Sequence, residues 1–169
     1  HCVVTSVARD DLKDGGASPV LDHIVMIRAD GYLPVNQALI PYGEIAPVTG
    51  SPFDFNKPIS MGARIDMEHE QLEFGGGYDH NFVLANQDGD LALAATVIEP
   101  TTNRVMEVFT TEPGMQFYSG NFLSGLEGRN DIVYEKRHGF CMETQHYPNS
   151  PNEPDFPSTT LQPEEVYET

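Results

Sequence analysis

Two alternating segments in the middle of the chain are joined by a short turn. They run from Leu91 to Glu99 and from Arg104 to Thr111, and they are rich in Val, Ala and Thr. The linker Pro100-Thr101-Thr102-Asn103 has the turn chemistry of a β-hairpin. The sequence therefore predicts an antiparallel hairpin.

The first segment of this hairpin is apolar on both faces. Side chains alternate between the two faces of a strand, which separates its apolar residues into two sets. These are Leu91, Leu93, Ala95 and Val97 on one face, and Ala92, Ala94 and Ile98 on the other. A strand without a polar face is typical of a sheet that is covered on both sides. We therefore expect this segment to lie inside a sandwich.

Glycine and proline leave little room for long helices. The chain of 169 residues has 15 Gly and 13 Pro, and both residues interrupt helices. Further strands are predicted at Leu21–Ile27, ended by a turn at Ala29-Asp30-Gly31, and at Tyr78–Leu84, Gln116–Tyr118 and Gly139–Gln145. Only Met61–Leu72 has enough helix formers for a short helix. The predicted class is all-β, and residues 1–169 are expected to form one domain because no repeat or composition shift marks a boundary.

The chain is strongly acidic, which excludes two classes of partner. It has 26 Asp+Glu against 9 Lys+Arg, a formal net charge of -17, which repels phosphate backbones and anionic membranes. We therefore expect no nucleic-acid partner and no membrane partner. The sequence has no bilayer-spanning apolar run and no signal-peptide pattern, so the expected compartment is the cytoplasm. The chain opens on His1 rather than Met, so we expect that it is processed or is part of a longer protein.

Neither the cysteines nor the histidines show the spacing of a metal site. Cys2 and Cys141 lie at opposite ends of the chain, outside any CxxC or Cys/His pattern. No two of the histidines from His23 to His146 have the helical i, i+4 spacing of paired ligands. The glycines at 75–77 precede a strand rather than a helix, which argues against a phosphate-binding loop. The sequence predicts no metal and no other cofactor.

One carboxylate interrupts an apolar segment near the end of the chain. An extended backbone would place Phe140, Met142 and Thr144 on one face, and Cys141, Glu143 and Gln145 on the other. A carboxylate with bulky apolar neighbours is partly desolvated, which suits it to exchange a proton near neutral pH. Glu143 is therefore a candidate general base. A glutamate on an edge strand that reaches solvent explains the same pattern.

Two more polar residues are candidates for binding a polyol. Asp79 follows the glycines at 75–77, and a carboxylate accepts hydrogen bonds from a pair of sugar hydroxyls. Gln116 is an amide in an aromatic segment, able to donate to a hydroxyl and accept from it. Two structural alternatives stay open, in which Asp79 caps the glycine turn and Gln116 satisfies backbone groups. Asp79 with Glu143 would also fit the carboxylate pair of a glycosidase.

Several motifs occur along the chain in an order that a known family shares. They are Tyr32-Leu33-Pro34-Val35, Ile40-Pro41-Tyr42-Gly43-Glu44, Gly77-Tyr78-Asp79-His80-Asn81-Phe82, Thr111-Glu112-Pro113-Gly114, Gln116-Phe117-Tyr118-Ser119-Gly120-Asn121 and Cys141-Met142-Glu143-Thr144-Gln145. On these motifs the chain resembles the C-terminal half of the aldose 1-epimerases, also called galactose mutarotases. The resemblance implies an antiparallel β-sandwich of the galactose mutarotase type, of which this chain would be a part.

The resemblance implies interconversion of the α and β anomers of a free aldose such as galactose or glucose, without a cofactor. Carried over by position, the family's catalytic base falls on Glu143, its sugar-binding aspartate on Asp79 and a polar residue of its sugar pocket on Gln116. The base takes the proton of the C1 hydroxyl while an acid protonates the ring oxygen. A family histidine that would supply this acid falls on Val7. The N-terminal half of the family, with a second histidine and an arginine, is absent from this sequence.

The missing histidine leaves three hypotheses. The chain is an epimerase polypeptide that is incompetent without an acid from elsewhere. Alternatively, it is a non-catalytic sugar-binding or regulatory domain that keeps Asp79 and Gln116 for recognition. In the third hypothesis it is a fragment that associates with itself or with a partner chain, because half a sandwich exposes strand edges and an apolar face. The first two hypotheses share a monosaccharide as the partner.

Overall fold

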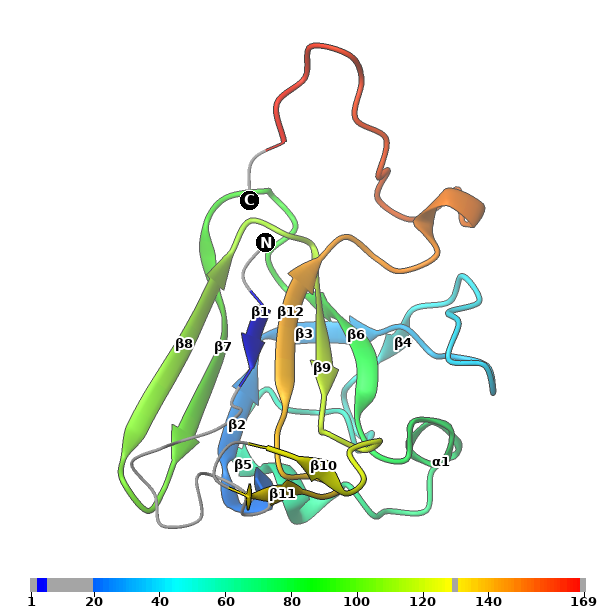
Figure 1. Ribbon diagram of the computed structural model, residues 1–169. Coiled ribbons are helices and arrows are strands. Elements are labelled where there is room, and N and C mark those ends of the chain that lie inside the picture. The colour runs from blue at the N-terminus through cyan, green and yellow to red at the C-terminus, as the bar shows by residue number, and fades with distance from the viewer. Residues whose placement is uncertain (1–2, 6–19, 129–130, 168–169) are drawn as a thin grey trace.

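The computed structural model describes residues 3–5, 20–128 and 131–167. These residues form antiparallel sheets with little helix, which confirms the all-β class (Figure 1). The helical elements are the helix α1 (Glu70–Gly75) and the 3-10 turns η1 (Val20–Asp22), η2 (Met61–Ala63) and η4 (Ser150–Asn152). The predictions made on His1, Cys2 and Val7 lie outside the described residues.

The larger sheet has six strands in the order β1-β12-β9-β6-β3-β4. In that order they are β1 (Val3–Thr5), β12 (Cys141–Gln145), β9 (Gly114–Tyr118), β6 (Asp79–Leu84), β3 (Ala29–Tyr32) and β4 (Ala46–Pro47). All neighbouring strands pair antiparallel. The strands predicted at Tyr78–Leu84, Gln116–Tyr118 and Gly139–Gln145 therefore correspond to β6, β9 and β12, which lie side by side.

The second sheet has four strands in the order β5-β2-β7-β8. They are β5 (Ile59–Ser60), β2 (Ile24–Ile27), β7 (Ala92–Glu99) and β8 (Arg104–Thr110), and a separate small sheet pairs β10 (Leu126–Glu127) with β11 (Val133–Tyr134). The predicted hairpin is confirmed, since β7 pairs antiparallel with β8 and Glu99 lies opposite Arg104 (Figure 1). Within this sheet β7 has a strand neighbour on each side, β2 and β8.

Both larger sheets contribute side chains to one buried apolar cluster. The six-stranded sheet provides Phe82, Leu84, Met115, Phe117 and Met142, and the four-stranded sheet provides Val25, Ile27, Ala95, Val97 and Val108. Phe53 and Phe55, from the segment between β4 and β5, join this cluster. Phe117 stacks on Tyr78 at 5.4 Å between ring centroids. The opposite face of the six-stranded sheet is consequently left for polar side chains.

The turn predicted at Ala29-Asp30-Gly31 is wrong, because these residues belong to β3. A glycine is needed at position 31 because Ile45 and Ala46 lie too close to it for a side chain, not because the chain turns there. A Cβ atom on Gly31 would lie 2.7 Å from the Cγ2 atom of Ile45 and 3.0 Å from the carbonyl oxygen of Ala46. Gly31 therefore allows β4 to pair with β3, an interior role that glycine also serves in strands.

The predicted limits of β2 and of the helix also differ from the structure. The segment predicted as a strand from Leu21 begins as the 3-10 turn η1, and the strand itself starts at Ile24. The helix predicted over Met61–Leu72 is replaced by η2 and the separate helix α1, which starts at Glu70. The side chain of His69 caps α1 by accepting a hydrogen bond from the Gln71 N–H. This cap fixes where the helix begins.

The strict alternation predicted for β7 is interrupted. The pairing of β7 with β8 shifts between Leu93 and Ala95, and both Ala94 and Ala95 are buried. A shift of this kind places consecutive residues on one side of the strand. Leu91, which was predicted to share one face of this strand with Leu93, lies before the strand and is 69% exposed.

Candidate active site

One face of the six-stranded sheet carries a row of polar side chains. On β12, Met142 and Thr144 are buried while Cys141, Glu143 and Gln145 are partly exposed, which confirms the predicted division of this strand into two faces. The register aligns Glu143 with Gln116 on β9, and Gln116 with Asn81 on β6.

The second row of this face lies two residues away along each strand. Cys141 on β12 is opposite Tyr118 on β9, and Tyr118 is opposite Asp79 on β6. Directly opposite side chains on adjacent antiparallel strands are within contact distance of one another. The three residues predicted as site residues, Glu143, Gln116 and Asp79, therefore occupy adjacent positions on one sheet face.

An open pocket of ≈ 420 Å³ lies over this face. Its polar lining is provided by the sheet, through Asp79, Asn81, Gln116, Tyr118, Glu143 and Gln145. Its apolar lining comes from the connecting segments, through Val35, Leu39, Pro41, Phe122 and Pro148. The volume falls within the range of small-molecule sites, about 300–1,000 Å³. The structure thus brings all three predicted site residues into one pocket.

Hydrogen bonds between side chains orient the polar floor of the pocket. The Gln116 Nε2 atom donates to Oδ1 of Asp79 at 2.8 Å. The Gln145 Nε2 atom donates to Oδ1 of Asn81 at 3.0 Å and to Oε1 of Gln116 at 3.5 Å. The amide of Gln116 is therefore held with its NH₂ group toward Asp79 and its oxygen toward Gln145. This agrees with a role in the pocket rather than with the alternative in which Gln116 satisfies backbone groups.

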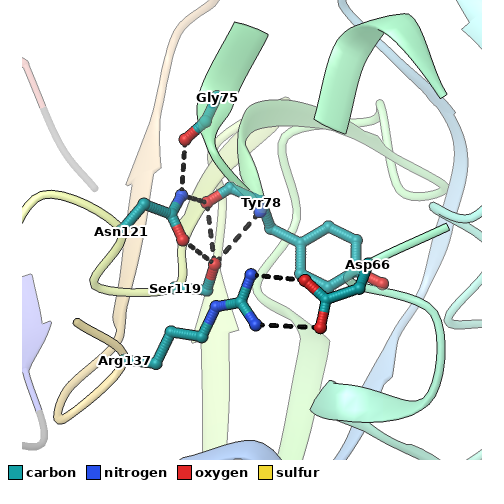
Figure 2. A network of polar contacts seen from close by, with 6 residues as sticks. All are labelled: Asp66, Gly75, Tyr78, Ser119, Asn121 and Arg137. Carbon is teal, nitrogen blue, oxygen red and sulfur yellow. Dashed lines mark hydrogen bonds and ion pairs between the residues drawn. The ribbon is translucent and has the colours of Figure 1, made fainter. Parts of the chain in front are cut away.

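A separate network holds the glycine turn that leads into β6 (Figure 2). The Asn121 Nδ2 atom donates to the carbonyl oxygens of Gly75 and Tyr78, at 2.8 and 2.9 Å. Ser119 accepts a hydrogen bond from the Tyr78 N–H at 3.0 Å and donates to Oδ1 of Asn121 at 2.7 Å. These two residues, rather than Asp79, bind the turn, so the carboxylate of Asp79 remains available to the pocket.

The same figure shows an ion pair at the edge of this network. Arg137 binds both carboxylate oxygens of Asp66, at 2.8 and 3.1 Å (Figure 2). The Arg137 N–H donates to the carbonyl oxygen of Gly120, next to Asn121. The segment before β12 is thereby tied to the turn that follows β9.

Burial and the neighbouring charge act together on the titratable groups of the pocket. Burial raises the pKa of Asp79, the hydrogen bond from Gln116 opposes this shift, and the charge of Glu143 adds to it. Burial also raises the pKa of the Tyr118 hydroxyl. The thiol of Cys141 has its pKa raised to about 11 by burial and then by the charge and hydrogen bonding of Glu143.

An Asp79→Asn variant is expected to be more stable than the unmodified protein at neutral pH. An acid whose pKa is raised by folding binds its proton more readily in the folded state, so its stabilising contribution is lost as pH rises through the folded pKa. Asparagine removes this loss and still accepts the hydrogen bond from Gln116. Urea unfolding from about pH 4 to about pH 7 should show the variant gaining relative stability as pH rises. A variant that is less stable at neutral pH would contradict the assignment.

The alkylation rate of the Cys141 thiol is expected to depend on the charge of Glu143. With a pKa of about 11 the thiol is almost wholly protonated at neutral pH and should react slowly with iodoacetamide. Glu143→Gln removes two of the causes that raise this pKa, so alkylation of Cys141 should accelerate. Peptide-resolved mass spectrometry separates Cys141 from Cys2. The exposed Glu135 provides the matched control, because Glu135→Gln should leave the rate unchanged.

Sequence reasoning missed several residues of the pocket. Asn81 and Gln145 occur inside the motifs that carry the family resemblance, and their alternation with Asp79 and Glu143 along the strands was the available signal. Phe122 had no such signal, because it lies in the segment after β9. Its ring stacks on Tyr118 at 6.1 Å between centroids and is 61% exposed. The pocket therefore has an accessible aromatic surface beside its polar floor.

Comparison with known proteins identifies the family. The family model described as aldose 1-epimerase matches residues 13–169. The chain belongs to the aldose 1-epimerase family. It is 47% identical over 156 residues to a galactose mutarotase of Homo sapiens, covering 91% of this chain and 44% of that protein. It is 36% identical over 156 residues to the aldose 1-epimerase of Escherichia coli (strain K12), covering 91% of this chain and 45% of that protein.

Solved structures of aldose 1-epimerase homologues have the same fold. A homologue from C. elegans superposes with a TM-score of 0.77 at 21% identity, over 93% of this chain and 46% of that chain. A galactose 1-epimerase from Lactobacillus acidophilus gives a TM-score of 0.67 at 28% identity, over 80% of this chain and 38% of that chain. The chain thus spans less than half the length of these relatives. The predicted galactose mutarotase type of β-sandwich is confirmed.

Among residues 20–128 and 131–167, no group of three or more His, Cys, Asp and Glu side chains is arranged to hold a metal ion. In the same part of the chain, no helix has the length and apolar character needed to cross a membrane.

Proposed function

We propose that this chain takes part in interconverting the α and β anomers of free aldohexoses such as galactose and glucose. The observation that carries the proposal is the convergence of Glu143, Gln116 and Asp79 on one pocket. Its relatives are named galactose mutarotase and aldose 1-epimerase. This family match favours an epimerase over the glycosidase alternative for the pair Asp79 and Glu143.

The proposed chemistry consists of proton transfers and needs no cofactor. Glu143 accepts the proton of the C1 hydroxyl while an acid donates a proton to the ring oxygen. The bond between C1 and the ring oxygen breaks, the C1–C2 bond rotates, and closure of the ring returns both protons. Asp79 and Gln116 hold the hydroxyls of the sugar during these steps. Their roles follow from the family positions and from their place beside Glu143.

The two sides of the pocket suit the two kinds of surface on a sugar ring. The carboxylates and amides of the floor offer acceptors and donors to hydroxyl groups. Phe122 and Tyr118 present stacked rings to the apolar C–H face of a pyranose. This division of polar and apolar contacts is typical of sites that fix the orientation of a small ligand.

A second candidate function is sugar binding without catalysis. Among the described residues that line the pocket, none is a histidine, and the raised pKa of Tyr118 makes its hydroxyl a weak acid. The epimerase proposal assigns the acid that protonates the ring oxygen to a group outside this lining. In the second candidate function, a chain that acts alone binds the sugar and leaves its ring closed.

Polarimetry and calorimetry together test the two candidates. Freshly dissolved α-D-galactose is followed by polarimetry with the isolated chain, and binding is measured by calorimetric titration with galactose up to millimolar concentration. Catalysed mutarotation supports the epimerase. Binding without acceleration supports the second candidate. If the chain neither binds galactose nor accelerates its mutarotation, both candidate functions are contradicted.

The remaining predictions concern the domain organisation, the partners and the compartment of the chain. We infer that residues 1–169 form one domain, supported by the apolar cluster that both larger sheets share. We also propose self-association, or completion by a missing N-terminal half, since this chain covers 44–45% of the length of these relatives. Gel filtration tests the association, because a clean monomer would count against it. The cytoplasm remains the expected compartment.

A further inference from the structure

A buried polar pair lies on the core side of β6, directly behind the pocket. His80 is 0% exposed and Gln71 is 4% exposed. His80 follows Asp79 on β6, so the two side chains point to opposite faces of the sheet. Asp79 points into the pocket, and His80 points toward α1, which carries Gln71. The chemistry proposed above uses neither buried side chain.

The pair is hydrogen-bonded to the backbone of two residues that line the pocket, Asp79 and Val35. The Asp79 N–H donates to Nδ1 of His80 at 3.1 Å, and Nε2 of His80 lies 3.2 Å from Oε1 of Gln71. Gln71 binds both backbone groups of Val35, since its Oε1 accepts from the Val35 N–H at 2.7 Å and its Nε2 donates to the Val35 carbonyl at 2.9 Å. One continuous chain of hydrogen bonds thus connects Asp79 to Val35.

These contacts determine the protonation of His80. Because Nδ1 accepts from a backbone N–H, it carries no proton, and Nε2 must be the atom that donates to Gln71. Burial lowers the pKa of His80 to about 3, which keeps the ring neutral near neutral pH. Phe53 packs against this ring at 4.7 Å and Tyr32 at 6.0 Å between centroids. The imidazole is therefore fixed in one tautomer and one orientation.

Val35 begins the segment of residues 35–41, which forms the Val35–Pro41 wall of the pocket that Asp79 also lines. Val35 forms a β-bridge with Pro41, and the loop between them is closed by a hydrogen bond from the Asn36 N–H to the Ile40 carbonyl at 3.0 Å. Val35, Leu39 and Pro41 all line the pocket. Because Gln71 binds both the N–H and the carbonyl of Val35, it holds the backbone in place at the start of this wall.

We propose that His80 and Gln71 are positioning residues that set the spacing between Asp79 and the Val35–Pro41 wall, and hence the fit of the pocket to a pyranose. The inference rests on the proposed function, since it assigns to Asp79 the binding of a sugar hydroxyl. A misplacement of about 1 Å in a positioned group is enough to reduce activity by about a hundredfold. A rigid buried support is the usual means of preventing it.

Two matched variants of His80 separate positioning from general stability. In His80→Asn the amide oxygen replaces Nδ1 and still accepts from the Asp79 N–H, whereas the contact to Gln71 is lost. In His80→Gln the amide replaces Nε2 and keeps the contact to Gln71, whereas the acceptor for Asp79 is lost. Gln71→Met removes both bonds to Val35 at similar volume. Val97→Ala, in the four-stranded sheet, is the control for a loss of stability alone.

The experiment measures galactose affinity by calorimetry and amide hydrogen exchange at Asp79 and Val35 for each variant. Each His80 variant breaks one bond of the chain that connects Asp79 to Val35, so both are expected to weaken galactose binding roughly tenfold, but only His80→Gln is expected to lose protection at Asp79. Gln71→Met is expected to lose protection at Val35 and to weaken binding. Val97→Ala should lower stability without changing affinity.

The outcomes distinguish this inference from the proposed function. If the unmodified chain binds galactose and Asp79→Ala does not, but His80→Gln and Gln71→Met bind as tightly as Val97→Ala, the positioning role is refuted and the proposed function stands. If His80→Asn binds galactose as tightly as the unmodified chain, the link between His80 and Gln71 does not set the spacing and the inference is also refuted. If the unmodified chain binds no galactose, the proposed function fails and the positioning role fails with it.

Discussion

The Glu143→Gln variant is expected to lose about 10²–10⁴-fold of the catalysed mutarotation rate, the range that a general base contributes. Glutamine has nearly the same shape as glutamate and cannot accept the C1 proton at neutral pH. Glu143 lies beside Gln116 in the register and shares the pocket with Asp79, so the sugar should still be bound. Polarimetry should therefore show a loss of rate, while calorimetry should show galactose affinity within roughly threefold of the unmodified protein.

The control for this prediction is a carboxylate on the other sheet. Glu107 is exposed on β8, and Glu107→Gln changes the net charge by the same amount. Glu107→Gln should leave the rate unchanged. An unchanged catalysed rate in Glu143→Gln would show that another group is the base. A loss of affinity in place of a loss of rate would make Glu143 a binding residue instead.

The Asn121→Ala variant is expected to destabilise the fold by about 3 kcal/mol, because it leaves the buried carbonyl oxygen of Gly75 without this donor, at a cost of about 1–3 kcal/mol, and removes two further hydrogen bonds of about 1 kcal/mol each, to Tyr78 and from Ser119. Asn121 is 7% exposed, and its amide satisfies the carbonyl oxygens of Gly75 and Tyr78. In a domain of this size the loss corresponds to about 10 °C in Tm. Because Tyr78 immediately precedes Asp79, galactose binding should weaken as well.

Thermal and urea unfolding measure this effect directly. Asn152 makes its side-chain hydrogen bond at the surface, to Asn149 at 2.7 Å, so Asn152→Ala is expected to change stability by no more than about 0.5 kcal/mol. Equal effects of the two substitutions would show that the turn between α1 and β6 does not depend on Asn121. If Asn121→Ala loses stability but keeps its galactose affinity, the turn between α1 and β6 does not influence sugar binding in the pocket.

Local pattern was a reliable guide to which residues share a face. The alternation along Cys141–Gln145 separated Glu143 from Met142 before any tertiary information was available, and the structure has the same division. The turn residues between β7 and β8 likewise predicted the hairpin. Both features depend on neighbours in the sequence, so periodicity and turn chemistry are sufficient to predict them.

Local pattern failed where a residue serves a distant contact. Gly31 was interpreted as part of a turn, but its role is to admit Ile45 and Ala46 against β3. The helix predicted over Met61–Leu72 is broken between Ala63 and Glu70. Within that break Ile65 is 2% exposed and belongs to the shared apolar cluster. Burial in the tertiary core therefore outweighs helix propensity in this segment.

The sequence by itself determined the fold class, the family resemblance and the identity of the three candidate residues. It did so because motifs and alternation are properties of short segments. Only the tertiary structure decided that β6, β9 and β12 are neighbours, which brings together Asp79, Gln116 and Glu143. The tertiary structure also decided that Gln71 meets His80 and Val35 behind the pocket. Such pairings join segments far apart in the chain and are selected by burial of the whole core, which no local period encodes.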